Sequence, residues 1–192
     1  MEDLILHSAL RNVDKGFYID VGANDSTAIS VTRFFYERGK LQLYGGGTAA
    51  TFSDEVAKKG EYPKTIEVDV VTLSDIQEQY PPPSSRNAEI HFCKIDVEGF
   101  EKEVLEGIKD WDKFRPWIFV VEATEPGTSI PCHEKWEYIL LEHGYNLALN
   151  TGLNRYYLDI RKQHLQAYFA DTKNFLKQHE VIKLNMQQIK IN

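Results

Sequence analysis

The chain has 192 residues, of which 42% are hydrophobic, 27% charged and 12% aromatic, as in one globular domain with a sizeable core. Its formal charge of −7 argues against a nucleic-acid partner, because a phosphate backbone needs a basic surface. A membrane span of roughly 20 apolar residues is not found, the start MEDLILHSALRNVDKG does not read as a signal peptide, and two cysteines exclude a disulfide framework, so we expect a cytoplasmic protein.

The first half of the chain alternates between helical and strand patterns. Residues 2–12 predict a short helix with one apolar face, and Phe17–Val21 predicts a strand. A polar turn follows, and then a helix from about Thr27. Further along we predict strands at Leu41–Tyr44 and Thr65–Val71, a loop with some helix over 48–63, and a short helix at Leu73–Tyr80 before three prolines.

The second half repeats the alternation more strongly. A strand that ends at Ile95 runs through a turn into a helix whose inner face carries Phe100, Val104 and Ile108. The run WIFVVEA over 117–123 is apolar enough for a strand buried on both sides. We then predict a helix over Glu134–His143, strands at 145–150 and 155–160 that form a hairpin, helical pieces over 161–179 and an alternating tail over 181–191.

Strands that alternate with helices predict an α/β fold with a doubly wound, mostly parallel sheet that ends in an antiparallel hairpin. We expect a single domain over residues 1–192, with 161–192 as a C-terminal extension. We expect this extension either to cover or shape the substrate pocket or to complete a homodimer. In such sheets the ligand binds beyond the C-terminal ends of the strands.

The turn after the first strand reads V-G-A-N-D-S and contains one glycine, Gly22. A dinucleotide fold needs three glycines, and Ala23 and Asn24 place side chains where a pyrophosphate would approach. The turn also lacks a Walker lysine. Its acids, Asp20 and Asp25, suit a cationic ligand such as S-adenosylmethionine. The alternative is a generic strand–turn–helix with solvated acids.

Acidic residues follow three predicted strands, and in a parallel sheet they would share one edge. Such a group of carboxylates is costly unless a cation, a metal ion or a proton relieves the repulsion, although caps and surface acids remain the alternative. Methyl transfer to an alcohol needs a base for the hydroxyl proton. The candidates are Asp96, Glu98, Glu122 and His133, although His133 also fits a capping or surface role.

Four segments together resemble the FkbM-type family of S-adenosylmethionine-dependent methyltransferases: FYIDVGAND, SVTRFFYERG, HFCKIDVEGFEKEVLEGI and the stretch from RPWIFVVEATEP to GLNRYYL. The resemblance implies a class I methyltransferase (Rossmann-like) fold, with seven strands of which the seventh is antiparallel. It also implies methylation of a hydroxyl on a sugar, polyketide or similar small molecule. In that frame Asp20, Gly22 and Asn24 match the cofactor-binding turn, and Asp96 and Glu98 match the acidic loop that faces cofactor and acceptor. We therefore expect cofactor contacts from Asp20, Gly22, Ala23, Asn24, Asp25 and Asp96.

One expected feature is missing after the first helix. Folds of this kind place an acid that binds the ribose about 20 residues after the glycine turn. That count falls at Gln42–Gly45, which contains no acid, and the next one is Asp54. The chain therefore passes from the first helix into a later segment of the family, at a junction near Gly39–Lys40. Either a stretch is absent from this sequence at the junction or the gene product is shortened; we favour the former, because a shortened chain would leave core faces uncovered.

Three functions follow from these patterns. The leading hypothesis is an O-methyltransferase that uses S-adenosylmethionine and no metal ion. The second is a non-catalytic remnant of the fold that binds a ligand or a protein partner, as loss of the ribose acid suggests. The third is a metal-assisted enzyme in which Asp96, Glu98 and Glu122 are oxygen ligands of a type that suits Mg²⁺.

Overall fold

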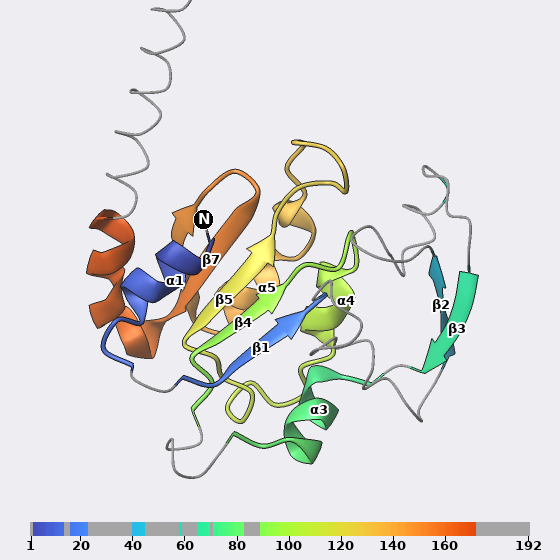
Figure 1. The fold of residues 1–192 in the computed structure, drawn as a ribbon, viewed down its shortest axis with the longest axis horizontal. Coiled ribbons are helices and arrows are strands. Elements are labelled where there is room, and N and C mark those ends of the chain that lie inside the picture. Colours follow the sequence, from blue (N-terminus) through green and yellow to red (C-terminus); the bar gives the residue numbers. More distant parts are fainter. Residues whose placement is uncertain are drawn as a thin grey trace, which may run out of the picture.

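The computed structural model describes residues 2–13, 16–22, 40–44, 58, 65–69, 71–82 and 89–171. Its main sheet has five strands in the order β1-β4-β5-β7-β6 (Figure 1). The first two pairs are parallel and the last two are antiparallel. These strands are β1 (Tyr18–Val21), β4 (Phe92–Ile95), β5 (Ile118–Glu122), β6 (Tyr145–Asn150) and β7 (Asn154–Asp159).

Helices cover both faces of this sheet (Figure 1). Buried residues of α1 and η5 pack together on one face, and buried residues of α3, α4 and α5 pack together on the other. The sandwich of helices around a sheet is the α/β architecture predicted from the alternating pattern. The helical elements are α1 (Glu2–Ala9), α3 (Leu73–Gln79), α4 (Glu101–Glu106), α5 (Glu137–Glu142) and the 3₁₀ helices η4 (His133–Lys135) and η5 (Ile160–Leu165).

Strand β5 shows why the sheet is covered on both sides. All five of its residues are buried. Ile118 and Val120 belong to the core with α1, whereas Phe119 and Val121 belong to the core with α4 and α5. Successive side chains of a strand point to opposite faces, so a continuous apolar run is what a doubly covered strand requires. The prediction of a central, doubly buried strand is confirmed.

The expectation of a mostly parallel sheet is correct only for its first part. Parallel pairing joins β1, β4 and β5, and the β6–β7 hairpin then adds two antiparallel strands, as expected for the C-terminal hairpin. Strands β2 (Lys40–Tyr44) and β3 (Thr65–Asp69) do not join this sheet. They pair with each other, antiparallel from Lys40–Asp69 to Tyr44–Thr65, so their ladder hydrogen bonds are made within a separate two-stranded sheet.

Several expectations lie outside the described residues: the helix from Thr27, the tail over 181–191 and nearly all of the 48–63 segment. Across the ranges that the structure does describe, we find no helix with the length and apolar character needed to cross a membrane.

Candidate functional site

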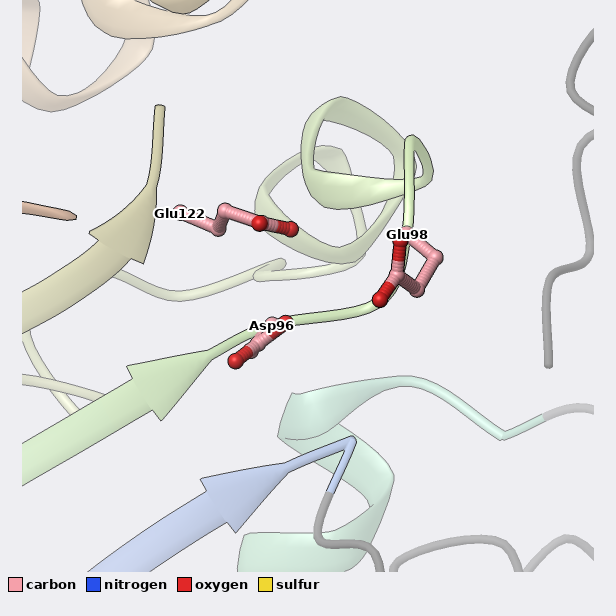
Figure 2. Close-up of side chains that lie close together, drawn as sticks. All are labelled: Asp96, Glu98 and Glu122. Carbon is pink, nitrogen blue, oxygen red and sulfur yellow. The ribbon is translucent and has the colours of Figure 1, made fainter. Parts of the chain in front are cut away.

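Three carboxylates meet at the C-terminal edge of the parallel strands. Asp96 follows β4 directly, Glu98 lies in the next turn, and Glu122 is the last residue of β5. One oxygen from each side chain lies within 4.8 Å of the other two. Figure 2 shows the Glu122 carboxylate extending towards Glu98, with Asp96 beside them. Because β4 and β5 are parallel neighbours, their ends lie at the same edge, and this convergence of Asp96, Glu98 and Glu122 was predicted.

The charge of this group is partly relieved. Glu122 is 8% exposed, and its Oε2 is buried without a hydrogen-bond partner. Burial, followed by the charges of Asp96, Glu98 and Glu101, raises the pKa of Glu122 to about 8, so its protonated form predominates at neutral pH. Burial and the Asp96 charge also raise the pKa of Glu98. Asp96 forms an ion pair with the Lys94 ammonium at 3.2 Å.

The glycine turn of β1 packs against the same loop. The Asp96 N–H donates to the Val21 carbonyl at 2.9 Å, which continues the β1–β4 pairing past the end of β4. Gly22 has a φ of 93°, in the region that favours glycine. A Cβ at this position would lie 1.6 Å from the Asp96 carbonyl oxygen. The contact with Asp96 is thus one reason for a glycine here, and the ligand contact expected of Gly22 stays a prediction.

The turn between β4 and α4 contains a residue that the sequence analysis missed. Glu101 begins α4, is 3% exposed, and accepts hydrogen bonds from backbone N–H groups of the preceding turn. Gly99 in that turn has a φ of 95°, which confirms the expected tight turn. The available signal in the sequence was an acidic residue at the first position of a helix. Such a residue is usually explained by its favourable interaction with the helix dipole, so it does not by itself indicate a role in the site.

His133 lies apart from the three-carboxylate group. Its segment is joined to the end of β5, since the Cys132 N–H donates to the Ala123 carbonyl at 2.9 Å. His133 Nε2 is 3.9 Å from a Glu137 oxygen, and its Nδ1 is buried without a hydrogen-bond partner. The Glu137 carboxylate is engaged by Arg155 and by the Tyr157 hydroxyl. The part of the chain that the structure describes therefore places His133 in a different polar network from Asp96.

The remaining residues considered in the sequence lie in β1, in β4 or outside the described residues. Asp20 lies in β1, in register with Lys94 of β4, and the three-carboxylate group does not include it. Ala23, Asn24 and Asp25 lie outside the described residues. Cys93 is fully buried, as expected for a core residue of its strand.

The donor set of this site limits its chemistry. Carboxylate oxygens can receive a proton, attract a cationic ligand, or coordinate a hard cation such as Mg²⁺. The site lacks the three-glycine turn of a pyrophosphate cradle, and the carbonyl of Asp96 occupies the space beside its one glycine. It is therefore suited to a cationic small molecule and to proton transfer.

A comparison with models of known protein families assigns the chain to one family. The model of the methyltransferase FkbM domain matches residues 38–147, more than half of the sequence. The chain belongs to the FkbM methyltransferase family. The matched range of this FkbM domain contains Asp96, Glu98, Glu122 and Glu101, whereas β1 with Gly22 and strand β7 lie outside it. No curated protein and no solved structure matches the chain.

Proposed function

We propose that this FkbM-family protein is an S-adenosylmethionine-dependent O-methyltransferase that acts on a hydroxyl of a sugar, a polyketide or a similar small molecule. Family membership supports methyl transfer. The observation that carries the proposal is the convergence of Asp96, Glu98 and Glu122 at the C-terminal edge of parallel strands. Open α/β sheets bind their ligands at this edge.

The donor suits the residues of this edge. S-adenosylmethionine carries a sulfonium and an ammonium group, and the described edge offers carboxylates without a phosphate cradle. Asp20, Gly22 and Asp96, with the turn Ala23–Asp25, are the residues that would hold it. When bound, it supplies an electrophilic methyl group on a positively charged sulfur.

The carboxylates supply the acid–base part of the reaction. An alcohol is a weak nucleophile until its proton is removed, so a base must lie within hydrogen-bond reach of the hydroxyl. Glu122 is largely protonated at neutral pH, which leaves Asp96 and Glu98 to accept the proton. We assign this role to Asp96, which follows β4 directly and whose side chain is oriented by the contact with Lys94 at 3.2 Å. As the acceptor oxygen takes the methyl group, its proton passes to this carboxylate.

A second candidate is a non-catalytic member of the family that binds a ligand through the same edge. One observation favours it. Within the stretch at which the ribose acid was expected, Gln42–Tyr44 lie in β2, and β2 pairs with β3 outside the main sheet. Such a protein would retain affinity for the donor product but would not turn over any hydroxyl acceptor.

Two measurements test the proposal in sequence. Isothermal titration with S-adenosylhomocysteine reports whether the edge binds the donor product. A screen with methyl-labelled S-adenosylmethionine against sugars and hydroxylated polyketides then reports turnover. We expect binding and transfer to at least one acceptor class. Binding without transfer to any acceptor would support the second candidate, and absence of binding would contradict both.

A further inference from the structure

Glu101 is a buried carboxylate that cannot itself contact an acceptor. Its side chain is 3% exposed, and the largest effect on its pKa is the burial, which raises it. The Asp96 charge acts in the same direction, so the carboxylate is held among like charges. Burying a carboxyl in such surroundings costs free energy unless it makes strong hydrogen bonds. The role of Glu101 is therefore indicated by the backbone groups to which its side chain is hydrogen-bonded.

Its hydrogen bonds go to the turn before the helix as well as to its own backbone N–H. Glu101 Oε1 accepts from the Val97 N–H at 3.2 Å and from the Gly99 N–H at 3.1 Å. A helix cap would instead be a residue before the helix that accepts from N–H groups of the first turn. The N-cap position of α4, Phe100, makes no side-chain cap hydrogen bond. Glu101 is thus bonded to the segment that carries the site, and helix capping does not explain it.

The two N–H groups flank Glu98. The φ of Glu98 is 53°, in the left-handed region that is unfavourable for a non-glycine residue. Such a conformation persists only when the surrounding structure holds it. These bonds tie the Asp96–Val97 peptide and the Glu98–Gly99 peptide to one oxygen atom, which fixes both ends of the Val97–Glu98 segment. Figure 2 shows the result, with the Glu98 carboxylate directed to the same space as those of Asp96 and Glu122.

We propose that Glu101 is a positioning residue, which holds Glu98 in its left-handed conformation and so sets the geometry of the Asp96–Glu98–Glu122 group. The consequence for catalysis rests on the proposed function. The consequence for the turn does not, and the two are tested separately. In this proposal Glu101 belongs to the site although it contacts neither donor nor acceptor.

The structural test compares three variants of the full chain by amide hydrogen exchange, read by NMR at single residues. Glu101→Met keeps the length of the side chain but removes the acceptor, and Glu101→Gln keeps an acceptor oxygen. Glu106→Gln is the control, because Glu106 lies on the same helix, is exposed, and pairs with Lys102. We expect Glu101→Met to speed exchange at Val97 and Gly99 by about tenfold or more, with little change in β4 and β5.

Glu101→Gln should restore most of this protection, and the control should match the parent protein. Unchanged exchange at both amides in Glu101→Met would overturn the inference, and so would an equal rise across β4 and β5. If Glu101→Met does not fold, Glu101→Gln still decides. Its amide oxygen should keep both N–H groups protected, and rapid exchange at either one in an otherwise protected domain would contradict the assignment.

The kinetic test uses the acceptor found in the methyl-transfer screen. We expect Glu101→Met to lower kcat by about tenfold or more while KM for the donor changes by less than about twofold, and Glu101→Gln to recover most of kcat. Full kcat in Glu101→Met would overturn the catalytic part of the inference. If the parent protein transfers no methyl group, the proposed function fails, whereas the exchange experiment still decides whether Glu101 positions the turn.

Discussion

Gly22 and Asp96 lie in direct backbone contact: a Cβ on Gly22 would be 1.6 Å from the Asp96 carbonyl oxygen. The end of β1 and the loop after β4 are therefore packed as one unit, joined also by the hydrogen bond from the Asp96 N–H to the Val21 carbonyl. A change at the glycine turn must displace the loop that carries the carboxylates.

We expect Gly22→Ala to destabilise the protein strongly and to weaken S-adenosylhomocysteine binding. Gly152→Ala is a matched control, because Gly152 has the same φ of 93° but no atom within 4 Å of a built Cβ. The control measures the left-handed strain alone, about 1 kcal/mol, and Gly22→Ala should cost at least about 2 kcal/mol more because backbone must shift. Urea unfolding of both variants checks this; equal losses would show that the contact with Asp96 is easily relieved.

Asp96→Asn should abolish methyl transfer and leave the fold largely intact. The amide has nearly the same shape, but it cannot accept the hydroxyl proton. We expect kcat to fall by about two orders of magnitude or more, with a circular dichroism spectrum like that of the parent. Asp112→Asn is the control, because the Asp112 side chain is 90% exposed and does not belong to the three-carboxylate group. Full activity in Asp96→Asn would exclude it as the base.

The stability of the protein should fall as the pH rises towards 8. The pKa of Glu122 in the folded state is about 8, above its ordinary value of 4.5, so between these values the folded state binds more protons than the unfolded state. Unfolding free energy then decreases with pH across this window. The raised pKa values of Glu98 and Glu101 act in the same direction.

Glu122→Gln tests this assignment, because the amide has no proton to lose. We expect the variant to lose less stability than the parent between pH values of about 5 and 8, by more than about 1 kcal/mol. Urea unfolding at several pH values gives the comparison. Parallel stability curves for the two proteins would show that Glu122 is not the group that titrates.

We expect methyl transfer to be insensitive to chelators. Lys94 and the Glu122 proton already offset part of the charge of the three carboxylates, so a cation is not required for their approach. Treatment with EDTA should leave kcat unchanged, and ~5 mM Mg²⁺ should not raise the melting temperature. Activity that is lost with EDTA and restored by Mg²⁺ would favour the metal-assisted alternative, with Asp96, Glu98 and Glu122 as ligands.

Local sequence patterns were enough to predict several elements of the fold and the convergence of the three carboxylates. Apolar runs and helical periodicity placed the strands Phe92–Ile95 and Ile118–Glu122 and the helix between them. Because consecutive strands with a helical crossover are parallel, the acids that follow them had to share an edge. The convergence of Asp96, Glu98 and Glu122 was therefore implied by the order of elements along the chain, and the family by the motifs around them.

Tertiary structure decided the rest. The separate pairing of β2 with β3, the Asp96 carbonyl beside Gly22, and the raised pKa of Glu122 each depend on groups distant in the sequence. Glu101 is close in sequence to Glu98, yet its role was hidden, since an acid at a helix start has an ordinary explanation. Only the three-dimensional path of the turn shows that its oxygen accepts from the Val97 and Gly99 N–H groups, one residue before and one residue after Glu98. Sequence patterns report which residues are buried and in what order, whereas hydrogen-bond direction and charge environment depend on how the elements pack.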